Sequence, residues 1–124
     1  MIKSILIVFF GGGLGCIARY LIGRMVLATY TSSFPIATLI SNTVSCILLG
    51  FLAYYIVPKL DAERNLYLFA ITGFCGGLST FSTFSYETIS LLQNGFIGYA
   101  AINVLLSLLV GMGVLFIIYM KYQS

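Results

Sequence analysis

The chain has 124 residues, of which 60% are hydrophobic and only 7% are charged. A soluble domain usually carries about 25% charged residues, so the six basic and three acidic side chains cannot cover a water-facing surface. The basic residues are scattered, which argues against a nucleic-acid partner. Histidine is absent, and no acid–base pair or nucleophile arrangement is present. We therefore expect an integral membrane protein that is not an enzyme.

Four apolar stretches fill nearly the whole chain. Crossing a bilayer takes about 20 mainly apolar residues in a helix, and stretches of this kind run over residues 4–27, 35–57, 66–92 and 96–120. The sequence thus predicts an all-α membrane protein with one four-helix domain over residues 1–124. The three cysteines lie in different stretches and are expected to be free, buried thiols.

The distribution of charge bears on the orientation in the membrane. Four spans place both termini on one side, together with the most polar loop, at residues 59–65. The basic residues expected on that side are Lys3, Lys59, Arg64 and Lys121. The opposite side has Arg24 and Arg19. This small difference favours termini inside by the positive-inside rule, and so small a bias could allow insertion in both orientations.

The second span has a polar face. At 100° per residue, Thr38, Ser41, Asn42 and Ser45 fall within an arc of about 100°. Such side chains hydrogen-bond across membrane helices, or they line a pore or ligand site. The pattern leaves both interpretations open.

The third span is poorly suited to a continuous helix. Residues 73–85 contain three glycines and five hydroxyl residues. Gly76 and Gly77, followed by Ser79 and Thr80, predict a break near the middle of the bilayer. Non-helical backbone at that depth is tolerated where it is buried in protein or lines a cavity, and freed carbonyls can hold ions. The alternative is tight helix packing through Gly73 and Gly77.

Four further side chains have two interpretations each. Phe81 and Phe84 share one face, where they contact lipid or core, or turn positive ring edges toward an anion. Arg19 marks an ion pathway or anchors the helix at the interface. Glu87 is a surface charge or a vestibule residue.

Three segments resemble one family. Residues 73–85 read G-F-C-G-G-L-S-T-F-S-T-F-S, which closely resembles the form G-x-C-G-G-x-T-T-F-S-T-F of the CrcB/Fluc fluoride channel family. The family's glycine-rich first helix ending in Arg is similar to residues 11–19, and its F-P-x-G-T-L-x-x-N is similar to residues 34–42. The resemblance covers essentially the whole chain.

The resemblance implies a passive fluoride-selective channel that exports fluoride and lowers its cytoplasmic concentration, which confers fluoride resistance. The implied assembly is an antiparallel, dual-topology homodimer with two pores, whose third helix is broken near the midplane. Its implied location is the bacterial cell (inner or plasma) membrane, as a multi-pass protein.

The resemblance also implies roles for particular residues. The fluoride pathway would be formed by Asn42, Phe81, Phe84, Ser82, Thr83 and Ser85. Arg19 and Glu87 would lie in the vestibule. The backbone carbonyls of Gly76 and Ser79 would hold a structural Na⁺ at the dimer axis.

The chain departs from the family pattern at three positions. Ala37 and Ser45 stand where the family has glycine, and Ser79 stands where it has threonine. Two alternatives remain: a non-conducting or heterodimer partner subunit of such a channel, and a small multidrug-type transporter. The latter needs a membrane-embedded acid, which residues 4–27 lack.

Overall fold

The computed structural model describes residues 1–59 and 64–124. Asp61 and Glu63, the acidic residues of the expected polar loop, lie outside this part of the chain. Over the described ranges the regular structure is entirely helical, with no strand. Four helices, of 28, 24, 30 and 27 residues, are long and apolar enough to cross a membrane. The prediction of four transmembrane helices is therefore confirmed.

The first and fourth spans are single helices, whereas the second and third spans each consist of several consecutive helical elements. These elements are α1 (Ile2–Thr29) in the first span, α2 (Ile36–Phe51), η1 (Leu52–Ile56) and η2 (Val57–Lys59) in the second, α3 (Arg64–Leu66), η3 (Tyr67–Cys75), α4 (Gly76–Leu78) and α5 (Phe81–Gln93) in the third, and α6 (Ile97–Gln123) in the fourth. The ends of the four spans lie within three residues of the boundaries read from hydropathy.

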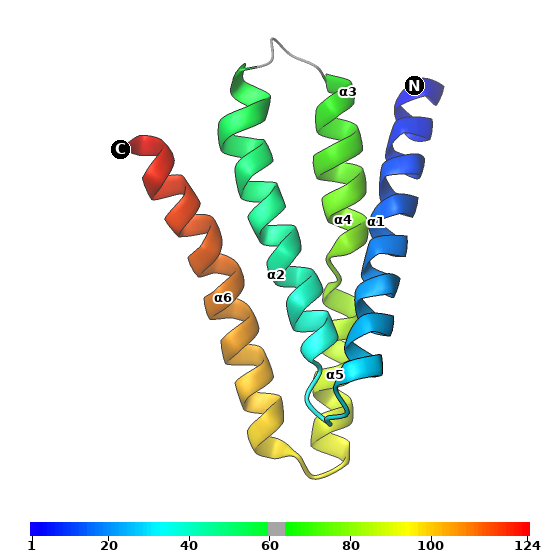
Figure 1. Cartoon of the computed structure of the whole chain (residues 1–124), viewed down its shortest axis with the longest axis vertical. Coiled ribbons are helices and arrows are strands. Elements are labelled where there is room, and N and C mark those ends of the chain that lie inside the picture. Colours follow the sequence, from blue (N-terminus) through cyan, green and yellow to red (C-terminus); the bar gives the residue numbers. More distant parts are fainter. Residues whose placement is uncertain (60–63) are drawn as a thin grey trace.

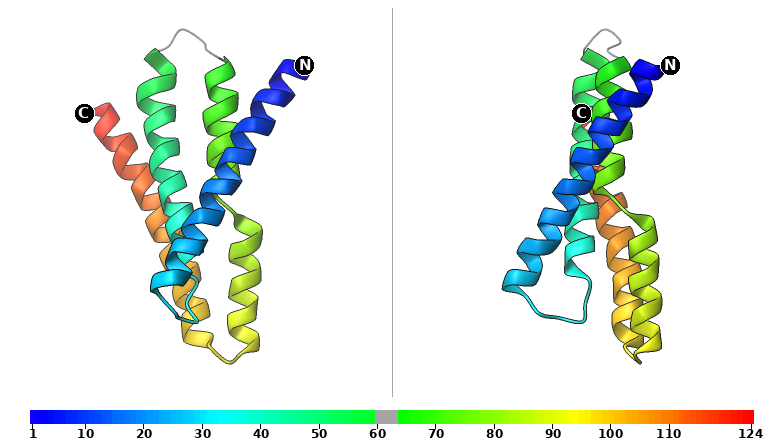
Figure 2. Two further views of the ribbon diagram at one scale, coloured as in Figure 1. Left: turned by 45° about the vertical axis from the view of Figure 1, so that its right-hand side comes forward. Right: turned by 90° about the vertical axis from the view of Figure 1, so that its right-hand side faces the viewer.

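The helices run up and down, with both chain termini at the same end of the molecule (Figure 1). α2 lies between α6 and the third span. α6 packs against α2 and α5, while α1 packs across η3 and α4. Toward the opposite end α1 diverges from α5 (Figure 2).

Glycines bring α1 into close contact with the third span. A Cβ added at Gly15 would collide with the carbonyl oxygen of Phe74, and one added at Gly77 would collide with the carbonyl oxygen of Gly12. Gly73, one turn before Gly77, also faces the backbone of α1. Small residues let membrane helices approach to backbone contact. The glycines of the third span therefore pack closely against α1, as the packing interpretation expected.

The core of the single chain is small. Among the described residues, the buried apolar side chains are Ala70, Cys75, Leu78, Leu91, Ala100 and Ile118, whereas most large apolar side chains are exposed. Helices in lipid gain no hydrophobic stabilisation from hiding such side chains. The cysteines are free as expected, but Cys16 is exposed and Cys46 is half-buried, so the prediction of burial is correct only for Cys75.

A glycine turn joins α5 to α6. Gly95 has a left-handed φ of 81°, which glycine adopts without steric cost. Its N–H donates to the carbonyl of Leu92 at 3.1 Å, and the N–H of Phe96 donates to the carbonyl of Leu91 at 2.9 Å. This pair of bonds is a Schellman motif. It ends α5 and returns the chain antiparallel as α6.

Candidate functional site

The backbone of the third span leaves the helical conformation for two residues. α4 ends at Leu78, Ser79 (φ −80°, ψ 156°) and Thr80 (φ −153°, ψ 118°) are extended, and α5 begins at Phe81 (Figure 1). Thr80 caps the new helix, because its Oγ1 accepts the N–H of Thr83 at 3.2 Å. Ser and Thr are preferred at this position for that reason.

The side chain of Asn42 holds the extended segment from α2. Its Oδ1 accepts the N–H of Thr80 at 2.7 Å, and its Nδ2 donates to the carbonyl of the same residue at 3.3 Å. One amide thus satisfies both backbone groups of an extended residue, which hydrocarbon could not do. An Asn side chain has two N–H donors, so one hydrogen of Nδ2 remains for another partner.

Ser45, one turn further along α2, bonds on the other side of the interruption. Its hydroxyl donates to the carbonyl oxygen of Cys75 at 2.8 Å. Both Ser45 and Cys75 are buried. Two residues of the polar face of α2, Asn42 and Ser45, therefore hydrogen-bond across helices to the backbone of residues 75–80.

The interruption changes the partners of nearby carbonyl groups. In a continuous helix the carbonyl of Gly76 would accept the N–H of Thr80, which here is bonded to the Asn42 amide. The carbonyl of Gly77 instead accepts Nε of Arg19 at 3.1 Å. Within the described residues, no hydrogen bond reaches the carbonyl oxygens of Gly76 and Ser79.

The two phenylalanines lie directly after the interruption. Phe81 is 80% exposed on the surface of the single chain, whereas Phe84 is half-buried. Their ring centroids are 5.9 Å apart with an interplanar angle of 40°. The pair therefore presents ring surface and ring edges beside the start of α5.

Hydroxyl groups surround the same helix start. Oγ1 of Thr80 donates to Oγ1 of Thr83 at 3.0 Å and lies 3.3 Å from Oγ of Ser82. The hydroxyl of Ser85 donates to the carbonyl of Phe81 at 2.9 Å. Of the hydroxyl residues expected in the pathway, Ser82 and Thr83 gather at the interruption, and Ser85 continues along α5.

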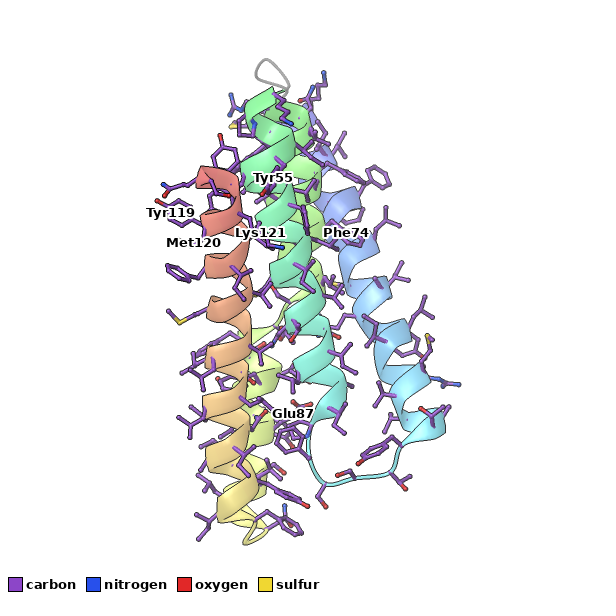
Figure 3. The ribbon with its side chains drawn as sticks, turned by 60° about the vertical axis from the view of Figure 1, so that its left-hand side comes forward. Tyr55, Phe74, Glu87, Tyr119, Met120 and Lys121 are labelled. Atoms are coloured by element: carbon purple, nitrogen blue, oxygen red, sulfur yellow. The ribbon has the colours of Figure 1, made fainter. Side chains whose placement is uncertain are left out.

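An open cavity of about 810 Å³ adjoins these hydroxyl groups, where α1 diverges from α5. Its lining includes Arg19, Arg24, Thr38 and Glu87. Oε1 of Glu87 accepts the hydroxyl of Thr38 at 2.8 Å, while Oε2 is buried without a hydrogen-bond partner in the described part of the chain. Figure 3 shows Glu87 between α5 and the start of α2. Arg19 and Glu87 thus line one cavity.

Sequence reasoning missed two of these connections. Thr80 was expected as part of the break but not as the cap of a new helix, although a threonine just before a helix is a typical N-cap signal. The bond between Thr38 and Glu87 joins residues 49 positions apart, and no local pattern marks such a pair. Another cross-helix bond joins α6 to α5, where Nδ2 of Asn103 donates to Oγ1 of Thr88 at 2.9 Å.

Four apolar spans with buried polar side chains gathered at an interrupted helix define a multi-pass membrane protein. Residues 6–119 match the family model described as "CrcB-like protein, Camphor Resistance (CrcB)". The chain belongs to this family.

Several relatives are similar over most of their length. A "Fluoride-specific ion channel FluC" of Pyrococcus furiosus is 46% identical over 108 residues, covering 87% of this chain and 86% of the relative. Proteins of the same name from Pyrococcus horikoshii and Clostridium perfringens are 45% and 43% identical, over 93% and 91% of this chain and 92% and 87% of the relatives. These relatives are ion channels, which confirms the expectation that the chain is not an enzyme.

Proposed function

We propose that this chain is a subunit of a passive, fluoride-selective channel that exports fluoride across the cell membrane. The observation that carries the proposal is the position of Phe81 and Phe84 beside the capped start of α5, in a chain up to 46% identical to fluoride-specific channels. The pathway would run along Asn42, Phe81, Phe84 and the hydroxyls of Ser82, Thr83 and Ser85.

The chemistry of this track suits a small, strongly hydrated anion. A passage for such an ion must replace its water by donors at close range, and conduction requires several weak sites. Amide hydrogens, hydroxyls and ring edges carry partial positive charge without a fixed cation. Arg19, bonded to a carbonyl at the edge of the cavity, would attract anions into the vestibule without binding them within the narrow track.

The assembly we propose is an antiparallel homodimer with two pathways. Gly76 is exposed, and its carbonyl accepts no hydrogen bond from the described residues. An unpartnered carbonyl facing hydrocarbon costs several kcal/mol, which supports a second copy covering this surface. The small bias of basic residues between the two ends supports insertion in both orientations. The interruption would then lie near the bilayer midplane.

The same carbonyls suit a structural Na⁺ at the dimer axis. The oxygens of Gly76 and Ser79 are free of hydrogen-bond donors among the described residues, and hard cations prefer oxygen ligands. Two carbonyls from each subunit would supply four oxygens. The ion would add positive potential and join the two interrupted helices.

A fluoride-electrode efflux assay tests the proposal. Purified protein is reconstituted in liposomes loaded with potassium fluoride, and release is followed after valinomycin addition, with potassium chloride as the control. We expect rapid fluoride release and no chloride release. Release of both halides at similar rates, or of neither, would overturn the assignment.

A further inference from the structure

Ser45 is the second α2 side chain that bonds to the third span beside its interruption. Asn42 holds Thr80 after Ser79, and Ser45 holds Cys75 before it. The two residues lie one turn apart on the same face of α2. We call Asn42 and Ser45 the anchor pair. Ser45 is only 4% exposed, so water does not compete for its bond.

The carbonyl of Cys75 is fully engaged by this arrangement. It accepts Oγ of Ser45 at 2.8 Å, Oγ of Ser79 at 3.0 Å and the N–H of Ser79 at 3.0 Å. A carbonyl oxygen has two lone pairs, so three donors leave no room for another ligand. The carbonyls of Gly76 and Ser79, by contrast, accept no bond from the described residues.

From these contacts we propose that Ser45 is a positioning residue, which fixes the backbone before the interruption as Asn42 fixes Thr80 within it. By holding the Cys75 carbonyl, Ser45 sets the direction of the Gly76 and Ser79 carbonyls and the entry of the chain into α5. The effect on transport rests on the proposed function, because α5 carries the two phenylalanines. The effect on the backbone does not depend on it.

The test compares two serines that differ in their bonding partner. Ser45→Ala removes the bond to the third span. Ser41→Ala is the matched control, because Ser41 is also buried on this face but donates to the carbonyl of Ala37 within α2, at 2.9 Å. Hydrogen exchange of the full-length protein in lipid nanodiscs is measured by mass spectrometry over residues 75–81. We expect Ser45→Ala to speed exchange at these amides about twofold to tenfold, as expected for loss of one hydrogen bond.

Further variants separate positioning from simple destabilisation. Ser45→Thr retains the hydroxyl and should restore parental exchange over residues 75–81. Ser45→Gly provides a second deletion of the hydroxyl if Ser45→Ala does not fold. Fluoride efflux of Ser45→Ala should fall by a similar factor.

The proposal is overturned if Ser45→Ala and Ser45→Gly exchange at the parental rate over residues 75–81. It is also overturned if Ser41→Ala accelerates exchange there equally. Absence of fluoride efflux from the parental protein would refute the proposed function, while the exchange comparison would still decide the role of Ser45.

Discussion

At the scale of single residues, the side chains of the proposed fluoride pathway differ in whether the folded chain already provides their hydrogen-bond partners. Both polar ends of the Asn42 amide are bonded to Thr80, so this residue stabilises the backbone whether or not it also meets an ion. Phe81 has no such role, because its ring is 80% exposed. Substitutions of the aromatic pair should therefore distinguish an effect on transport from an effect on folding.

We expect Phe81→Ile and Phe84→Ile each to lower fluoride efflux by about twofold to tenfold. Isoleucine keeps bulk and apolarity but lacks the ring quadrupole, whose contacts contribute about 0.5–1.5 kcal/mol in measured aromatic pairs. Efflux from liposomes is the measurement, with dimer recovery by size-exclusion chromatography as the folding check. Hydrophobic swaps of similar volume cost less than about 1.5 kcal/mol of stability, so the dimer should persist.

Phe9 provides the control for the aromatic pair. It forms an exposed edge-to-face pair with Phe10 on α1, with centroids 5.5 Å apart, and neither ring lines the cavity. Phe9→Ile should leave efflux unchanged. Parental efflux in both Phe81→Ile and Phe84→Ile would refute a pathway role for the rings.

At the scale of elements, the contact between α1 and the third span depends on glycines that lack space for a methyl group. We expect Gly15→Ala to lower the melting temperature in detergent, because the added Cβ would meet the Phe74 carbonyl and the Leu78 nitrogen. Overpacking of this kind costs about 1–3 kcal/mol, and it would push α1 away from the interruption.

Gly13→Ala is the matched control on the same helix. A Cβ at Gly13 meets nothing within 4 Å, and replacing glycine by alanine inside a helix adds about 0.5–1 kcal/mol of stability. The two variants should therefore shift the melting temperature in opposite directions. Equal melting temperatures would contradict the packing account.

At the scale of the whole molecule, aromatic contacts join α6 to the second span at both ends, through Phe34 just before α2 and Tyr54 in η1. Phe34 meets Tyr99 with centroids 5.9 Å apart, and Tyr54 meets Tyr119 at 5.5 Å. Positions 34 and 54 differ by 20, as do positions 99 and 119. At 1.5 Å per residue this separation is about 30 Å, the thickness of a typical hydrocarbon core. Figure 3 shows Tyr55, Tyr119 and Lys121 together at one end.

We expect this spacing to match the protein to bilayers with a hydrocarbon core of about 30 Å, because aromatic side chains prefer the membrane interface. Efflux measured in phosphatidylcholines of increasing chain length should be highest near that thickness. The Tyr54→Leu, Tyr119→Leu double variant should show a flatter dependence. Equal rates at every chain length in the parental protein would contradict this expectation.

The sequence by itself determined the four spans, their approximate ends and the unusual character of residues 73–85. These properties are local: hydrocarbon requires about 20 apolar residues with internally bonded backbone, and glycines among hydroxyl residues disfavour a regular helix. Hydrophobicity and composition therefore carry this information along the chain, without reference to any neighbour.

Only the tertiary structure decided which polar groups meet. Asn42 bonds to a residue 38 positions away, Ser45 to one 30 away and Thr38 to one 49 away. Helical periodicity places these residues on one face of α2, but it does not say which backbone lies opposite that face. The register between α2 and the third span is set by close packing of whole helices. Because that packing is a property of the assembled spans, the partners of each polar group, and the carbonyls left without one, follow from the fold alone.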